Sequence, residues 1–177
     1  RTLPFLVVIC VIVISIKRKK IKAVEVDIRR PFSWKFYFYW VIGFLAYALL
    51  IEFALYSFHI LEVSQWDHPF SSSIILVFGA VILAPVAEEL LFRGLILNVL
   101  IKKKISIHWS IIIQAFFFVL LHNFTYENTV SSNIGIVQSF IDGILYGYAR
   151  MYTKSIYTPI SMHISGNAIA ILERFIL

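Results

Sequence analysis

Long runs of apolar residues, separated by short polar stretches, dominate the pattern of the chain. Six runs cover residues 3–16, 36–61, 74–100, 107–121, 134–152 and 156–177. Most of them approach the length of about 20 residues that a helix needs to cross the hydrocarbon core of a bilayer. The pattern therefore predicts an all-α fold, a multi-pass transmembrane helical bundle of about six spanning helices.

We divide the chain into N-terminal membrane helices and loops at 1–73 and a core at 74–177, both within one membrane domain. The first apolar run is short for a span, and we interpret it as a clipped first helix. A signal peptide is the weaker alternative, because no small-residue cleavage site follows the run and the basic cluster at 17–20 lies after it. Cys10 is the only cysteine, so we expect no internal disulfide.

The composition agrees with this prediction and narrows the class of protein. The chain has 177 residues, of which 60% are hydrophobic and 15% are charged. A soluble domain is about half apolar and about a quarter charged, so we exclude a water-soluble enzyme, a disordered tail and a nucleic-acid module. The net charge is +6, and most of the basic residues lie in clusters between the apolar runs, which is typical of a multi-spanning membrane protein.

The connections between the runs alternate in charge. Those after the first, third and fifth runs contain basic residues, whereas 62–73 and 123–133 contain no Lys or Arg. Because basic loops tend to stay in the cytoplasm, we place these connections there and both termini outside. With the small size and the lack of an organelle signal, this favours a multi-pass protein of a bacterial plasma membrane, with the lipid bilayer around it and no nucleic-acid partner.

Three ionisable residues interrupt the third apolar run: Glu88, Glu89 and Arg93. An ionised group near the centre of a membrane helix costs about 2.5–3.5 kcal/mol on insertion scales, so such residues indicate function. Glu89 and Arg93 are four residues apart with the acid first, which predicts an ion pair. Glu88 lies about 100° further around the helix and is our candidate general base. A structural network of the three residues is the alternative.

Two later runs carry histidines. The fourth run ends at His122, and the sixth carries His163 and Asn167, which are four residues apart and share a helix face. Glu88 and His122 each lie about 25 Å along their helices from the turn at 102–104, so we expect them to meet across a helical hairpin. The same counting places His163 only about 12 Å from its own connection, so we expect it to be shallower.

The fifth run carries an acid beside two glycines. Gly143 and Gly147 have the small-xxx-small spacing that lets two membrane helices approach closely. For the neighbouring Asp142 we favour a helix-packing or pore-facing role over a catalytic one.

The collected residues fit the activation of water better than nucleophilic catalysis, because the chain has no H-E-x-x-H motif and no G-x-S-x-G motif. In one scheme, Glu88 and His122 hold and deprotonate a water that attacks a peptide carbonyl. His163 and Asn167 then stabilise the oxyanion. In the other scheme, Glu88, His122 and His163 hold a divalent metal such as zinc. Both schemes stay open, and we favour the metal-free one because no compact ligand motif is present.

Three short motifs resemble the signature motifs of a known family. They are Glu88-Glu89-x-x-x-Arg93-Gly94, Phe118-x-x-x-His122 and His163-x-x-x-Asn167. In this order, each on its own apolar run, they are similar to the motifs of the CPBP family. This family comprises CAAX prenyl-protease and bacteriocin-processing intramembrane endopeptidases and is also called the Abi family. The resemblance spans about residues 74–172.

The resemblance implies a multi-pass α-helical protease whose active site lies inside the bilayer, with 74–177 as the protease core. It implies that Glu88 and His122 activate water and that Glu89 supports them together with Arg93. It also implies an oxyanion pocket, formed by the motif that contains His163 and Asn167. The family is commonly described as metallo-type, and a metal-free glutamate mechanism has also been argued for it.

We therefore predict an intramembrane endopeptidase that hydrolyses a peptide bond in a small peptide or a membrane-anchored protein, as in CAAX-type or bacteriocin- and pheromone-type processing. A non-catalytic bacteriocin self-immunity or scaffolding membrane protein of the same fold is the alternative. A third hypothesis, a small proton transporter, rests on Glu88, Glu89 and Asp142 as intramembrane acids.

Overall fold

The computed structural model describes residues 3–60, 65–67, 69–123 and 129–176, and the side chains of 24, 70–72, 122 and 123 lie outside the described residues. All regular structure in these ranges is helical, in six helices joined by short connections, which confirms the predicted all-α class. The elements are α1 (Leu3–Lys17), η1 (Ala23–Val26), α2 (Trp34–Ser57), α3 (Phe70–Phe78), η2 (Gly79–Leu83), α4 (Ala84–Glu89), η3 (Leu90–Ile96), α5 (Leu97–Lys102), α6 (Ile107–Asn123), α7 (Val130–Thr153) and α8 (Tyr157–Ile176).

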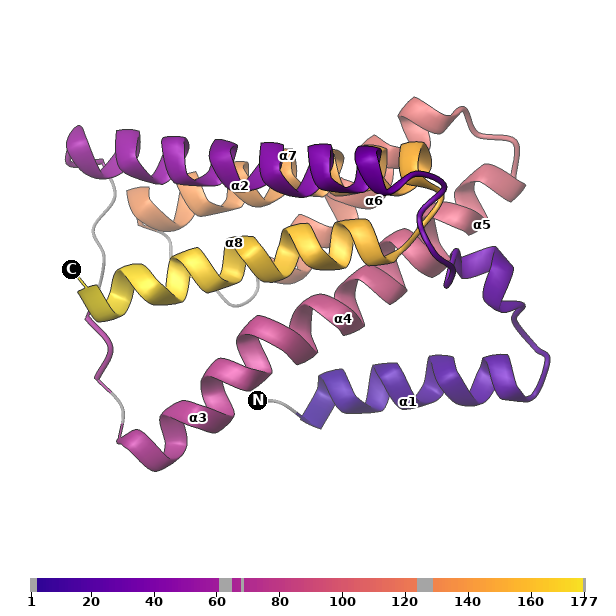
Figure 1. Ribbon diagram of the computed structural model, residues 1–177, viewed down its shortest axis with the longest axis horizontal. Coiled ribbons are helices and arrows are strands. Elements are labelled where there is room, and N and C mark those ends of the chain that lie inside the picture. The colour runs from indigo at the N-terminus through magenta and orange to yellow at the C-terminus, as the bar shows by residue number, and fades with distance from the viewer. Residues whose placement is uncertain (1–2, 61–64, 68, 124–128, 177) are drawn as a thin grey trace.

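The five elements from α3 to α5 follow one another without a break and form one long helix, residues 70–102. Helices α2, α7 and α8 pack against one another, and α6 packs along α7. The long helix crosses this group obliquely, with α1 on its far side (Figure 1). Its α4 segment therefore lies between α1 and α8.

Two helices in the described ranges are long and apolar enough to cross a membrane, by length and composition. They are Trp34–Ser57 and Ser73–Lys102, and Leu3–Lys17 and Ile107–Leu121 are shorter apolar helices. Large apolar side chains also point outward on several helices, as at Phe53 of α2, which is 72% exposed. An outer surface of this kind suits a lipid environment better than water.

The long helix contains two π-helical turns, η2 and η3, which flank α4. In the first, the backbone N–H of Ala84 bonds to the carbonyl of Gly79, five residues earlier. The next residue, Pro85, has no N–H to donate. The carbonyl of Ala80 is thus left for a donor from another helix. π-Turns inside α-helices often mark functional sites.

Two of the three residues that connect α7 and α8, Ser155 and Ile156, are buried, whereas Lys154 is exposed. The backbone N–H of Ile156 donates to the carbonyl of Asp27 at 3.0 Å. The hydroxyl of Ser155 donates to the carbonyl of Arg29 at 2.6 Å. Ser155 and Ile156 are buried as a result. The segment between α1 and α2 therefore covers the part of the connection that leads into α8.

The three basic connections meet at one end of the bundle, as their charges predict (Figure 1). Lys102, which ends α5, forms an ion pair with Glu25 of η1 at 2.7 Å. The Arg29 Nε donates to the carbonyl of Lys154, between α7 and α8, at 3.0 Å. The basic connections of the sequence therefore share one end of the molecule.

Candidate active site

The core of the site is an ion pair between Glu89 and Arg93, both of which are fully buried. The Arg93 Nη1 lies 2.8 Å from the Glu89 Oε1, which confirms the pairing predicted from their spacing. The Arg93 Nη2 donates to the carbonyl of Gly143 at 3.2 Å. Two aromatic rings cover the guanidinium, with its central carbon 4.4 Å from the ring centroid of Phe118 and 5.1 Å from that of Tyr146. This arrangement fixes the Glu89 carboxylate.

His163 lies between the two glutamates. Its Nδ1 is 2.9 Å from the Glu89 Oε1, and its Nε2 is 3.7 Å from the Glu88 Oε2. Because the Glu89 Oε1 is also the acceptor of the hydrogen bond from the Arg93 Nη1, we assign the Nδ1 of His163 as the donor. The imidazole also stacks on Tyr146, with ring centroids 5.1 Å apart and an angle of 22°. The ring orientation is therefore set, and Nε2 faces Glu88.

The expectation that His163 is shallower than Glu88 is wrong, because the two side chains face each other. The counting assumed that each connection marks the surface of the bundle. Ser155 and Ile156, directly before α8, are buried instead, and the long helix runs obliquely (Figure 1). Distances counted along the two helices therefore do not start from the same depth.

Asn167 lies one turn beyond His163 on α8, as predicted, and makes a contact that the sequence does not reveal. Its Nδ2 donates to the carbonyl of Ala80 at 2.8 Å. This is the carbonyl that the π-turn and Pro85 leave without a backbone donor. An amide nitrogen has two N–H groups, so one of them stays available for another acceptor.

His122 lies in the last turn of α6, and its side chain is outside the described residues. Its meeting with Glu88 therefore stays a prediction. The preceding residue, Leu121, lines the same cavity as Glu88, which brings this end of α6 close to the candidate base.

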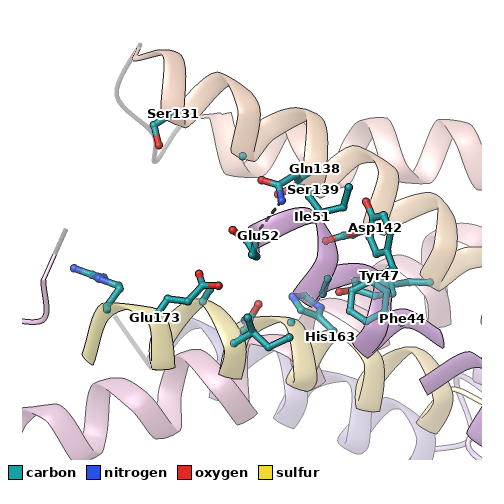
Figure 2. Close-up of a pocket in the computed structure, with 18 of the residues that line it drawn as sticks. Phe44, Tyr47, Ile51, Glu52, Ser131, Gln138, Ser139, Asp142, His163 and Glu173 are labelled. Carbon is teal, nitrogen blue, oxygen red and sulfur yellow. Dashed lines mark hydrogen bonds between the residues drawn. The ribbon is translucent and has the colours of Figure 1, made fainter. Parts of the chain in front are cut away.

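Two cavities reach the Glu88–His163 pair from different sides. A cavity of about 400 Å³ is bounded by α2, α7 and α8, and His163, Asn167 and Asp142 line it (Figure 2). A second cavity of about 380 Å³ lies toward α1 and contains Glu88. Its other lining residues are apolar: Pro4, Phe5, Val8, Ala87, Leu91, Phe92 and Leu121. The pair therefore stands where a polar cavity and an apolar one approach each other.

Sequence reasoning missed several polar residues around the site. The buried Gln114 donates to the carbonyl of Gly143 at 2.9 Å, beside Arg93. Glu52 and Gln138 line the polar cavity and bond to each other at 3.1 Å. Gln114 and Glu52 are polar residues inside apolar runs, the same signal that singled out Glu88. Asp142 faces the polar cavity, in agreement with the pore-facing role.

The donors for a metal ion are incomplete in the described part of the chain. No group of three His, Cys, Asp or Glu side chains that could hold a metal ion is present among those residues. Glu88 and His163 offer two donors, and a catalytic zinc takes three from the protein. The third would be His122, whose side chain lies outside the described residues. No catalytic step is therefore assigned to a metal.

Comparison with known proteins decides the family. The model of the type II CAAX prenyl endopeptidase Rce1-like family matches residues 70–169, more than half of the chain. The chain belongs to this family. The match contains all six candidate residues, which lie between Glu88 and Asn167, and it confirms the resemblance to CAAX prenyl proteases. The Rce1-like family is membrane-embedded, in agreement with the two apolar helices of spanning length.

A curated relative gives less information about the function than the family match does. The "Uncharacterized 24.3 kDa protein" of Escherichia coli is 27% identical over 107 residues, which cover 60% of this chain. The matched part spans 47%, or about half, of that relative's length. No solved structure matches the chain significantly.

Proposed function

We propose that the protein is an intramembrane endopeptidase that hydrolyses a peptide bond in a small peptide or a membrane-anchored protein. The observation that carries the proposal is the convergence of Glu88, Glu89 and His163, from two separate helices, between two cavities. Family membership supports the same class of reaction. We place the protein in a bacterial plasma membrane as a multi-pass bundle. The two helices of spanning length and the outward-facing apolar side chains support this placement.

In the proposed reaction, the Glu88 carboxylate takes a proton from a water, with His122 as the second group that orients it. The resulting hydroxide adds to the carbonyl carbon of the substrate. The C–N bond then breaks, and the proton held by Glu88 passes to the leaving nitrogen. The products are a new carboxylate and a new amine. Glu89 and Arg93 hold the site in place and do not touch the substrate.

His163 and Asn167 serve the oxyanion in this scheme. The Nδ1–H of His163 donates its hydrogen bond to Glu89. When the imidazole carries a proton on both nitrogens, its Nε2–H can therefore donate to an oxyanion. Two carboxylates flank the ring: Glu89 lies 2.9 Å from Nδ1 and Glu88 lies 3.7 Å from Nε2. Their negative charges offset the positive charge of this form. The free N–H of Asn167 is the second donor. A single oxyanion donor contributes about 10²–10³-fold to the rate of such reactions.

The substrate we propose carries an apolar group, and the CAAX type belongs to this class. The cavity beside Glu88 is lined almost entirely by apolar side chains from α1, the long helix and α6. A lipid chain or a large apolar side chain next to the scissile bond would be removed from water there, at about 25 cal/mol per Å² of apolar surface. Bacteriocin- or pheromone-type peptides are the other candidates.

The direct test is cleavage of a synthetic farnesylated CAAX-type peptide by the detergent-solubilised protein. We expect Glu88→Ala, His122→Ala and His163→Ala to lower the rate by about 10²–10⁴-fold. His59→Ala, a change at an exposed histidine in the turn after α2, is the matched control and should leave the rate unchanged. Undiminished cleavage by all three site variants, with normal expression, would falsify the proposal.

Metal dependence is tested in the same assay. We favour the metal-free scheme, so 1,10-phenanthroline should leave the cleavage rate unchanged. Loss of cleavage that added zinc restores would instead support a site formed by Glu88, His122 and His163.

A non-catalytic immunity or scaffolding protein of the same fold is the second candidate. The hydrogen bonds that Glu89 and Asn167 already make within the protein favour it, because they give both residues a structural purpose. If this candidate is correct, those alanine variants that still fold should protect cells against a bacteriocin as well as wild type does.

A further inference from the structure

The polar cavity next to His163 is acidic. Three carboxylates line it, and they come from three helices: Glu52 of α2, Asp142 of α7 and Glu173 of α8 (Figure 2). Arg174 also lines the cavity, but its guanidinium lies over the ring of Trp66, 5.2 Å from the centroid. Acids are rarely placed inside membrane helices without a function, so their gathering around one cavity indicates what the cavity binds.

Two of these carboxylates have an oxygen that no group in the described part of the chain pairs with. The Glu52 Oε1 accepts a hydrogen bond from the Gln138 Nε2 at 3.1 Å, whereas the Glu52 Oε2 is buried without a partner among the described residues. The Asp142 Oδ1 is buried without a partner in the same part of the chain. Gln138 and Asp142 lie one turn apart on α7, so both face Glu52 across the cavity. Both residues are half-buried, but these two oxygens are not accessible to solvent within the described part of the chain. A buried oxygen without a donor is costly, and a bound cation offsets that cost.

Aromatic rings complete the same lining. Phe44, Tyr47 and Tyr146 border the cavity, and Tyr146 also stacks on His163. The faces of such rings attract cations within about 6 Å, by about 0.5–2 kcal/mol depending on desolvation. An anionic group would meet three acids here and gain nothing from the rings. An apolar group without a donor would leave the buried carboxylate oxygens unpaired, and a neutral donor would leave their charge uncompensated.

We propose that this cavity selects a cationic group of the substrate, which is a Lys or Arg side chain or a free amino terminus. Glu52 and Asp142 bind the cation, and Glu173 adds to the negative field. The inference rests on the proposed function, since it assumes that the cavity beside His163 holds part of the cleaved chain. The substrate then places its apolar group beside Glu88 and its basic group on the other side of the Glu88–His163 pair.

The test measures binding of matched peptides to the full-length protein in detergent, by the anisotropy of a neutral fluorophore at the peptide carboxyl end. The peptides share one apolar sequence and differ at a single position, which is lysine, norleucine or glutamate, each with an acetylated amino end. A fourth peptide has norleucine and a free amino terminus, which distinguishes the two sources of the cation.

We expect the lysine peptide, the free-amine peptide or both to bind at least tenfold more tightly than the acetylated norleucine peptide. A tenfold difference in Kd corresponds to about 1.4 kcal/mol of binding free energy. The double change Glu52→Gln and Asp142→Asn should remove most of this difference, whereas Glu25→Gln, an acid outside the cavity, should not. The glutamate peptide should bind wild type more weakly than norleucine does and should bind the double variant better than wild type. A gain of this kind does not arise from misfolding. Equal binding of all peptides, or a preference that survives the double change, overturns the inference.

Mass spectrometry of the same mixtures separates this inference from the proposed function. Selective binding of the cationic peptides with no cleavage would reject the proteolysis and keep the acidic cavity as a cation-binding site. Cleavage of the lysine, free-amine and acetylated norleucine peptides with equal affinity and rate would reject the cation selection and keep the proteolysis.

Discussion

At the scale of single residues, the site depends on a carbonyl that two buried side chains share. The Gly143 oxygen accepts from Arg93 at 3.2 Å and from Gln114 at 2.9 Å, so α6, α7 and the long helix are joined at one atom. Arg93 in turn holds Glu89, which orients His163. A change at Gly143 is therefore transmitted to the candidate catalytic groups through Arg93.

Gly143→Ala should destabilise the protein by about 1–3 kcal/mol and slow cleavage, because overpacking forces neighbours to move. The new Cβ would lie 3.2 Å from the Arg93 Nη2 and 3.1 Å from the Ala115 Cβ. Gly135→Ala on the same helix is the matched control, since its Cβ meets nothing within 4 Å. It should be neutral or stabilising by up to about 1 kcal/mol. Denaturant unfolding in detergent measures both variants, and equal stabilities would contradict the argument.

A second residue-scale prediction concerns Glu25, which lies outside the apolar helices. The hydrogen bond from the Lys102 ammonium, and then that from the backbone N–H of Lys22, lower the pKa of this carboxyl below 4.5. A lowered pKa in the folded state means that the stabilisation is present above the unfolded pKa and is lost as pH falls through the folded value.

The melting temperatures of wild type and Glu25→Gln should therefore differ slightly at pH 7 and converge toward pH 3. Salt should reduce the difference, because the pair is partly exposed. A difference that stays constant over this pH range would show that the Glu25 charge has no part in it.

At the scale of elements, the short turn η1 ties the N-terminal segment to the long helix. Val26 is fully buried and occupies the space above Gly94, where a Cβ would lie 2.6 Å from the Val26 Cγ1. Gly94 belongs to the motif that carries Glu88, so the absence of a side chain there has a packing reason.

Gly94→Ala should destabilise the protein by about 1–3 kcal/mol, because the new methyl group collides with Val26. Val26→Ala alone should also destabilise, through the lost burial. The double variant should be more stable than the sum of the two changes predicts, by about 0.5–3 kcal/mol. The smaller side chain at 26 removes the collision, and the new methyl group at 94 fills part of the space that it leaves. Additive effects in a double-mutant cycle would contradict this contact.

The helices and the Glu89–Arg93 pair were predictable because both follow from the 3.6-residue period and from apolar length. The contact between His163 and the two glutamates was not, because it depends on a connection that another segment buries. The role of Asn167 toward Ala80 needs the π-turn before Pro85, which has no signature in the apolar pattern. Gln114 and Glu52 show the same signal as Glu88, a polar residue inside an apolar run, in the fourth and second runs.

At the scale of the whole molecule, the N-terminal helices provide walls for both cavities. Phe5 and Val8 of α1 face Glu88, and Glu52 of α2 lies in the cavity of His163. The family model begins at residue 70, so these walls come from a part of the chain that the match does not cover. We infer that the N-terminal helices shape the substrate range of the core.

Val8→Trp should fill much of the apolar cavity and raise the KM for a farnesylated peptide by about tenfold or more, with a smaller effect on kcat. Val11→Trp, a change at a 57% exposed position of the same helix, is the matched control and should leave the KM unchanged. An unchanged KM in both variants would show that the apolar group of the substrate binds elsewhere.

The most direct test of the account measures whether residues 88 and 163 are neighbours in the membrane. Glu88→Cys and His163→Cys are combined in a Cys10→Ser background, and membranes are treated with a short bifunctional thiol reagent. The account predicts efficient crosslinking of this pair and none for Glu88→Cys with Glu173→Cys, which lies about 15 Å further along α8. Absence of the first crosslink, with both thiols still reactive toward a single-headed reagent, would contradict the convergence on which the proposed hydrolysis depends.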